Sequence, residues 1–197
     1  AVIKNRASLT YLTARYSPFV CRFLIKDPIA CLASQYMHRE FGVEVVILIR
    51  HPAAYAASVK RLGWPVGFGM FFRQKELMED YLAPYLQDTE TSRLSFIEAV
   101  SLRWKCLYHV LSCFLEHNPD IIGVRHEDIS RNAPEQFKRL YRRLGIPYTK
   151  RTERKVHAYT SGINKTDPAP HKAHVLKRNS RDNIKRWKKT LSREEIS

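Results

Sequence analysis

Short runs of apolar residues alternate with helical periodicity in the first part of the chain. Residues 21–28 (CRFLIKDP) and 43–49 (VEVVILI) form two such runs, and each leads into a polar pair and a proline. Runs of this length predict strands that are buried on both faces of a parallel sheet. Residues 29–41 between them have a helical pattern that Gly42 ends. The spacing predicts a strand–helix–strand unit with a right-handed crossover.

Helical periodicity dominates the rest of the sequence. Pro52 stops the second strand and is well tolerated in the first turn of a helix that continues to residue 62. The same criteria predict a third strand at 120–129, a long loop at 161–179, a basic helix around Trp187, and helices over 70–85, 94–118, 134–144 and 150–160. We therefore predict an α/β fold with a parallel sheet flanked by helices, in a single domain spanning residues 1–197.

The end of the second strand carries the first candidate chemistry. Arg50 follows the apolar run directly, and Ser58 lies eight residues later in the next helix. Open α/β sheets bind ligands at the carboxyl ends of their strands, and a guanidinium with a hydroxyl near a helix start is suited to a phosphate. The alternative is an arginine that only caps the strand end against a surface carboxylate.

Charge narrows the classes of partner. The chain has 34 Lys and Arg against 19 Asp and Glu, which gives a net charge of +15. Such a surplus favours a polyanionic partner: a nucleotide, an acidic glycan, a nucleic acid or an anionic membrane. No apolar run is long enough to span a membrane. The four cysteines have no metal-ligand spacing and are expected to be buried thiols in a reducing, cytoplasmic compartment, and no metal site is expected.

Three strand ends carry polar clusters: Lys26-Asp27-Pro28, Arg50-His51-Pro52 and Arg125-His126-Glu127-Asp128. Taken together, these clusters resemble the sulfotransferases that use 3′-phosphoadenosine 5′-phosphosulfate (PAPS). In that family a strand ends in Arg-x-Pro, a serine follows eight residues after the arginine, and both residues hold the 3′-phosphate of the cofactor. The sequence RHPAAYAAS is similar to this motif, which assigns Arg50 and Ser58 to that role.

Two further segments support the resemblance. HEDI, at 126–129, resembles the Tyr-Glu-Asp strand end of the family, so His126 stands where a tyrosine contacts the adenine. The tail KRNSRDNIKRWKKTL is similar to the basic loop that precedes a tryptophan in the family. Ser180 and Arg181 occupy the places of cofactor-binding residues there, and Arg178 is the alternative arginine. Without the resemblance, the tail reads as a solvated basic helix.

The catalytic residues that the resemblance implies are in the first strand. Lys26 corresponds to the family lysine near the transferred sulfuryl group, and Pro28 follows where cytosolic members have a catalytic histidine. Asp27 is a candidate base, although a structural carboxylate at a strand end is the alternative. The resemblance implies a P-loop nucleotide kinase-like sulfotransferase fold. The family's first strand and phosphosulfate-binding loop do not occur in this sequence, and we expect them to precede residue 1.

The resemblance therefore predicts an enzyme that transfers the sulfuryl group of PAPS to a hydroxyl acceptor and releases adenosine 3′,5′-bisphosphate. The 197 residues alone, without the phosphosulfate loop, are expected to be inactive. A glycan is the expected acceptor, because the aromatic residues of 63–72 can stack on a sugar ring. Two alternatives remain: a basic nucleic-acid-binding domain, and a nucleotide-binding module of this family without catalysis.

Overall fold

The computed structural model describes residues 16, 22, 24–27, 30–166 and 177–196. The chain divides into two compact units, residues 1–31 and 32–197. In the first unit, Arg22 and residues 24–27 have no strand conformation, so the strand predicted at 21–28 is wrong for the residues described. Leu24 and Ile25 are 95% and 75% exposed, which explains the error: the apolar run has no partner surface that would stabilise a strand.

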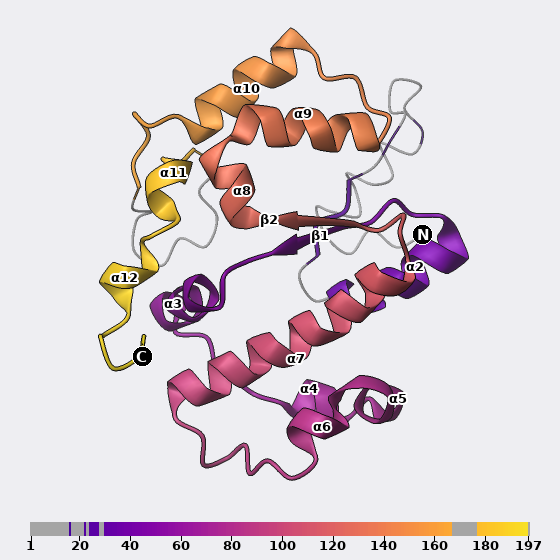
Figure 1. Cartoon of the computed structure of the whole chain (residues 1–197), viewed down its shortest axis with the longest axis vertical. Coiled ribbons are helices and arrows are strands. Elements are labelled where there is room, and N and C mark those ends of the chain that lie inside the picture. The colour runs from indigo at the N-terminus through magenta and orange to yellow at the C-terminus, as the bar shows by residue number, and fades with distance from the viewer. Residues whose placement is uncertain (1–15, 17–21, 23, 28–29, 167–176, 197) are drawn as a thin grey trace. The chain divides into compact units, whose positions relative to one another are not determined.

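The second unit is built on two parallel strands. β1 (Val46–Ile49) pairs with β2 (Ile122–Arg125) in a register that places Val46 opposite Ile122. These are the only strands in the part of the chain that the structure describes, so the fold is mixed α/β with a smaller sheet than predicted. Between them the chain forms α3 to α7, including the longest helix (Figure 1).

β1 is buried on one face rather than on both. Ile47 is 5% exposed, whereas Val46 and Leu48 are 38% and 49% exposed. The unpaired edge of β1 is instead contacted by the long helix α7 (Phe96–His117), because the Tyr108 hydroxyl donates to the carbonyl of Leu48 and accepts from the amide of Arg50. An apolar sequence shows what a strand is able to bury and does not show which face another element covers.

The helices before and after β1 follow the predicted boundaries. The 3₁₀ turn η1 (Ala30–Ala33) and α2 (Ser34–Phe41) occupy the predicted crossover segment. α3 (Pro52–Leu62) starts at the expected proline, and Gly63 ends it in the left-handed conformation that glycine adopts without strain. The predicted helix at 70–85 is broken into α4 (Gly69–Phe72), α5 (Lys75–Leu77), the π-helical turn η2 (Met78–Leu82) and α6 (Ala83–Leu86). Pro84 lacks the amide that a continuous α-helix requires.

α7 (Phe96–His117) is the longest helix and the main support of the unit. Ser95 and Glu98 form a reciprocal capping box at its start. The helix packs against α3 and η2 and crosses below the strands in Figure 1. Cys106 on this helix is fully buried, and burial raises the pKa of its thiol to about 11, which makes it an inert core residue.

The carboxyl-terminal half begins at β2. α8 (His126–Arg131) starts directly after the strand, so the predicted strand at 120–129 is too long and HEDI belongs to a helix. Glu127 and Asp128 lie in the first turn of α8, where carboxylates interact favourably with the free amides of the helix. α9 (Ala133–Arg143) and α10 (Lys150–Thr160) pack side by side above the strands (Figure 1).

The tail forms two short helices, α11 (Ser180–Asn183) and α12 (Trp187–Thr190), instead of one. α11 packs on α8, and α12 packs on α3. Leu191 is 6% exposed and completes a small core with Ala56, Val59 and Val100. Lys60 on α3 forms an ion pair of 2.7 Å with Glu195. These contacts attach the end of the chain to the helix that carries Ser58.

Candidate anion-binding site

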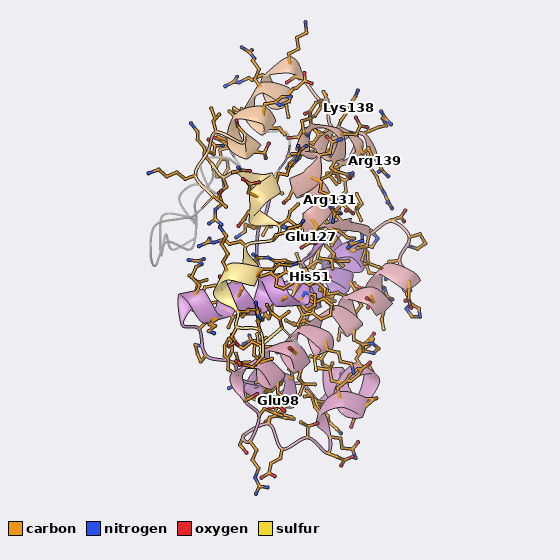
Figure 2. All side chains as sticks on the ribbon, turned by 60° about the vertical axis from the view of Figure 1, so that its left-hand side comes forward. His51, Glu98, Glu127, Arg131, Lys138 and Arg139 are labelled. Atoms are coloured by element: carbon orange, nitrogen blue, oxygen red, sulfur yellow. The ribbon has the colours of Figure 1, made fainter. Side chains whose placement is uncertain are left out.

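A buried carboxylate joins the ends of the two strands. Glu127 is 6% exposed, and its Oε1 accepts a hydrogen bond of 3.0 Å from the amide of His51. His51 is the N-cap of α3, and its Nδ1 accepts from the amide of Ala53. Figure 2 shows His51 and Glu127 close together at the junction of the strands and α3. The contact fixes the direction in which the chain leaves β1, and so the position of Arg50.

Arg50 is held through its backbone, which leaves part of its guanidinium available. Trp104 donates to the carbonyl of Arg50 at 2.9 Å, and the amide of Arg50 donates to the Tyr108 hydroxyl. The Nε of Arg50 is buried and has no hydrogen-bond partner among the described residues. Burial lowers the pKa of Arg50, and the negative charge of Glu127 opposes this shift. A buried donor without a partner is costly, which makes a ligand for it favourable.

Arg50 lies on a cavity of about 120 Å³ that α3 and the tail form together. This volume is several times the ~10–15 Å³ that one water molecule requires. Ser58, Ala54 and Ala57 provide the α3 wall, and the small alanines leave room beside the serine. We call this cavity the arginine cavity, because its lining includes Arg50, Arg61, Arg178 and Arg186.

The charges of the arginine cavity are not balanced within its lining. Nη1 of Arg61 and Nε of Arg178 are buried and, like Nε of Arg50, have no hydrogen-bond partner in the part of the chain described. Burial lowers the pKa of Arg178, and the neighbouring charges of Arg61 and Arg186 lower it further. No Asp or Glu is among the described lining residues. An anion with several oxygen atoms would accept from these donors and relieve their mutual repulsion.

A larger cavity adjoins the arginine cavity. It has a volume of about 690 Å³, and Arg178 and Asn183 line both cavities. Its other walls are largely apolar and aromatic and come from α8, α9 and α10: His126, Ile129, Phe137, Tyr141, Val156 and Tyr159. We call it the aromatic cavity. Burial lowers the pKa of His126, as does the charge of Arg50, so the neutral imidazole is favoured there.

A third cavity, of about 570 Å³, holds the residue that the sequence favoured over Arg178. Arg181 lines it together with Arg131 and His157, and the Nη2 of Arg181 donates to the carbonyl of Arg131. Ser180 lines the aromatic cavity. The structure thus brings Arg178, the alternative arginine, together with Arg50 and Ser58, and places Arg181 elsewhere.

Lys26 and Asp27 belong to the first unit, residues 1–31. Lys26 is exposed, and Asp27 accepts from the amide of Ala30 at 3.2 Å. This contact is of the kind that a carboxylate makes at the start of a helical turn. It agrees with the structural alternative given for Asp27 and leaves Lys26 as the candidate for chemistry in this unit.

Sequence reasoning missed two arginines of the site. Arg61 follows Ser58 by three residues on α3, so both lie on one helix face, and this spacing could have identified it. Arg186 had no such signal, because its position depends on how the tail packs on α3. Among the described residues, no group of three acidic, His or Cys side chains is arranged to hold a metal, and no helix combines the length and apolar character needed to cross a bilayer.

Comparison of the chain with protein-family models, with curated proteins and with solved structures found no match.

We expect Glu127→Leu to lower the free energy of unfolding by about 2–4 kcal/mol, because it leaves the His51 amide unpaired and removes the carboxylate whose charge stabilises the Arg50 guanidinium. Glu127→Gln keeps an oxygen acceptor for that amide and should cost about half as much. Urea unfolding followed by circular dichroism measures both. Equal losses for the two variants would contradict a stabilising role for the hydrogen bond.

Proposed function

We propose that this chain is a sulfotransferase domain that transfers the sulfuryl group of PAPS to a hydroxyl acceptor, on a P-loop nucleotide kinase-like sulfotransferase fold. The observation that carries the proposal is the arginine cavity at the carboxyl end of a parallel strand. Its Arg50 and Ser58 have the spacing of the family motif for the 3′-phosphate, and both line one cavity.

The arginine cavity suits a phosphate group on a nucleotide. Its donors come from two sides, Arg50, Ser58 and Arg61 from the strand end and α3, and Arg178 and Arg186 from the tail. A phosphomonoester has enough oxygen atoms to accept from both sides at once, and its charge is stabilised by guanidinium groups in a partly buried site. Binding would therefore link the tail to α3 through the ligand.

The aromatic cavity suits the rest of the same ligand. It meets the arginine cavity at Arg178 and Asn183, so a molecule with a phosphate in one can place a flat ring in the other. His126, the residue that the resemblance assigns to adenine, lines this cavity beside Tyr159. A neutral imidazole can stack on or hydrogen-bond to an adenine. We assign adenosine 3′,5′-bisphosphate as the part of the cofactor that these two cavities hold.

Sulfuryl transfer requires in-line geometry and stabilisation of the charge that develops on oxygen. The acceptor hydroxyl oxygen forms a bond to sulfur, the bond from sulfur to the bridging oxygen breaks, and the nucleotide leaves as the bisphosphate. In this proposal Lys26 stabilises the leaving oxygen, and a base accepts the hydroxyl proton. Trp64 and Phe72 are 58% and 47% exposed in the predicted acceptor segment and provide ring faces for a glycan, whereas Phe71 is fully buried.

The first test is cofactor selectivity. We expect the protein to bind adenosine 3′,5′-bisphosphate more tightly than adenosine 5′-monophosphate in calorimetric titrations. Arg50→Gln should lower the affinity for the bisphosphate by about 2–4 kcal/mol, or roughly 30- to 1000-fold, because a charge-assisted contact to the 3′-phosphate is lost. Arg125→Gln is the matched control, since Arg125 is exposed at the end of the paired strand and lines none of the three cavities. Equal affinity for the two nucleotides would overturn the assignment of the arginine cavity.

The second test concerns the tail. Because Arg178 and Arg186 reach the arginine cavity from the tail, we expect amide exchange across 177–190 to slow when the bisphosphate binds. Hydrogen exchange with mass spectrometry measures this, and peptides from α7 serve as the control, since no α7 residue lines the arginine cavity. Unchanged exchange in the tail with intact binding would remove Arg178 and Arg186 from the site.

The third test separates an enzyme from a binding module. The full-length protein is incubated with radiolabelled PAPS and a panel of glycans and phenols. We expect transfer to a glycan, and a loss on the order of 10²- to 10³-fold in Lys26→Ala with bisphosphate binding unchanged. Lys75→Ala, at an exposed position of α5, is the control. Tight bisphosphate binding without transfer to any acceptor would favour the non-catalytic module instead.

A further inference from the structure

α9 and α10 carry the same arrangement of basic residues. In each helix the basic positions are i, i+1, i+4 and i+5, which cover an arc of about 140° on a helix of 3.6 residues per turn. All eight side chains are exposed: Lys138, Arg139, Arg142 and Arg143 on α9, and Lys150, Arg151, Arg154 and Lys155 on α10. We call them the α9 stripe and the α10 stripe.

The two stripes are turned away from each other. Phe137 and Tyr141 of α9 and Thr152 and Val156 of α10 line the aromatic cavity that the helices share. The stripes occupy arcs of their helices that point away from this cavity, except that Lys155 at the edge of the α10 stripe also lines it, so the other seven side chains face the solvent on the outer sides of the pair. Figure 2 labels Lys138 and Arg139 on α9, in a region where many basic side chains project outward.

The stripes have few compensating interactions. Arg143 donates to the carbonyl of Pro119, and Nε of Arg154 donates to the carbonyl of Lys150. None of the eight forms an ion pair with a carboxylate in the part of the chain that the structure describes. Clustered cations without carboxylate partners produce a positive potential that attracts a polyanion.

We propose that the two stripes bind an acidic polysaccharide, a chain carrying sulfate or carboxylate groups, that wraps around the α9–α10 pair. A flexible polyanion can follow both outer sides of a helix pair. Duplex DNA cannot, because its persistence length is about 50 nm and it would contact one stripe only.

Two other polyanions fit the stripes less well. Single-stranded nucleic acids are held by stacking on aromatic side chains, and the residues between the basic positions include no exposed aromatic one. Peripheral membrane helices insert an apolar face, whereas the apolar faces of α9 and α10 point into the aromatic cavity. A sugar chain recognised by charge alone requires neither feature.

The test uses three variants that each remove three positive charges. The first is Lys138→Gln, Arg139→Gln and Arg142→Gln, and the second is Lys150→Gln, Arg151→Gln and Arg154→Gln. Arg143 and Lys155 stay unchanged, because one bonds to Pro119 and the other lines the aromatic cavity. The control is Lys75→Gln, Arg93→Gln and Lys105→Gln, exposed positions on α5, on the segment before α7 and on α7. Binding of a heparin decasaccharide is measured at several salt concentrations, beside a DNA duplex and a single-stranded oligonucleotide.

We expect each stripe variant to lower heparin affinity about tenfold at 0.15 M salt and to reduce its salt dependence, because counterion release decreases with each lost contact. The control should change affinity less than threefold, and bisphosphate binding should be the same in all variants, so the outcome does not depend on the function of the arginine cavity. An equal loss in the control would reduce the effect to net charge and overturn the proposal. Stronger binding of the duplex, with only one stripe required, would assign the surface to nucleic acid.

Discussion

The partial burial of Arg50 is the constraint on which the rest of the site depends. A guanidinium at the end of a strand is stable there only if its charge has nearby compensation and its backbone is satisfied. Glu127 supplies the charge from the first turn of α8, directly after the adjacent strand, while Trp104 and Tyr108 of α7 hold the backbone. The parallel pairing of the strands brings Arg50 and Glu127 to the same edge. The register of the two strands, the packing of α7 and the position of the Arg50 guanidinium therefore depend on one another.

The local elements could be predicted from the sequence, because their signals are local. Pro52 and Gly63 delimit α3, and the Ser95–Glu98 capping box starts α7 within two residues of the expected position. Two of the failures concern contacts between distant segments. The apolar residues at 21–28 predict a strand, but a strand also requires a partner. β1 has one, and its Val46 and Leu48 are exposed because their face of the strand is not covered in the part of the chain described. The HEDI segment directly follows the apolar residues of β2. Its Glu127 and Asp128 nevertheless stabilise the start of a helix more than the end of a strand.

In the candidate site, too, the positions set by local sequence could be predicted, and those set by contacts between distant segments could not. The spacing of Arg50 and Ser58 is set by one strand end and one helix, so the sequence could place both on a single cavity. The choice between Arg178 and Arg181 depends on how the tail folds, and counting back from Trp187 favours Arg181, which lies within α11 and lines another cavity. Asn179 caps α11 by accepting from the amide of Asp182, and this turn directs Arg181 toward Arg131. Counting residues along the sequence does not reveal the direction in which this turn places the arginine side chains.

The basic surplus of the chain serves two physically different environments. In the arginine cavity the guanidinium groups are partly desolvated and no carboxylate is among the described lining residues, so each contact with an anion is strong, geometrically restricted and little screened by salt. On the α9 and α10 stripes the charged side chains are exposed to solvent, so a contact there is weaker, adaptable and sensitive to salt. A small phosphate requires the first environment and a long flexible polyanion the second. Net charge alone does not distinguish these two environments, whereas the burial of the basic side chains does.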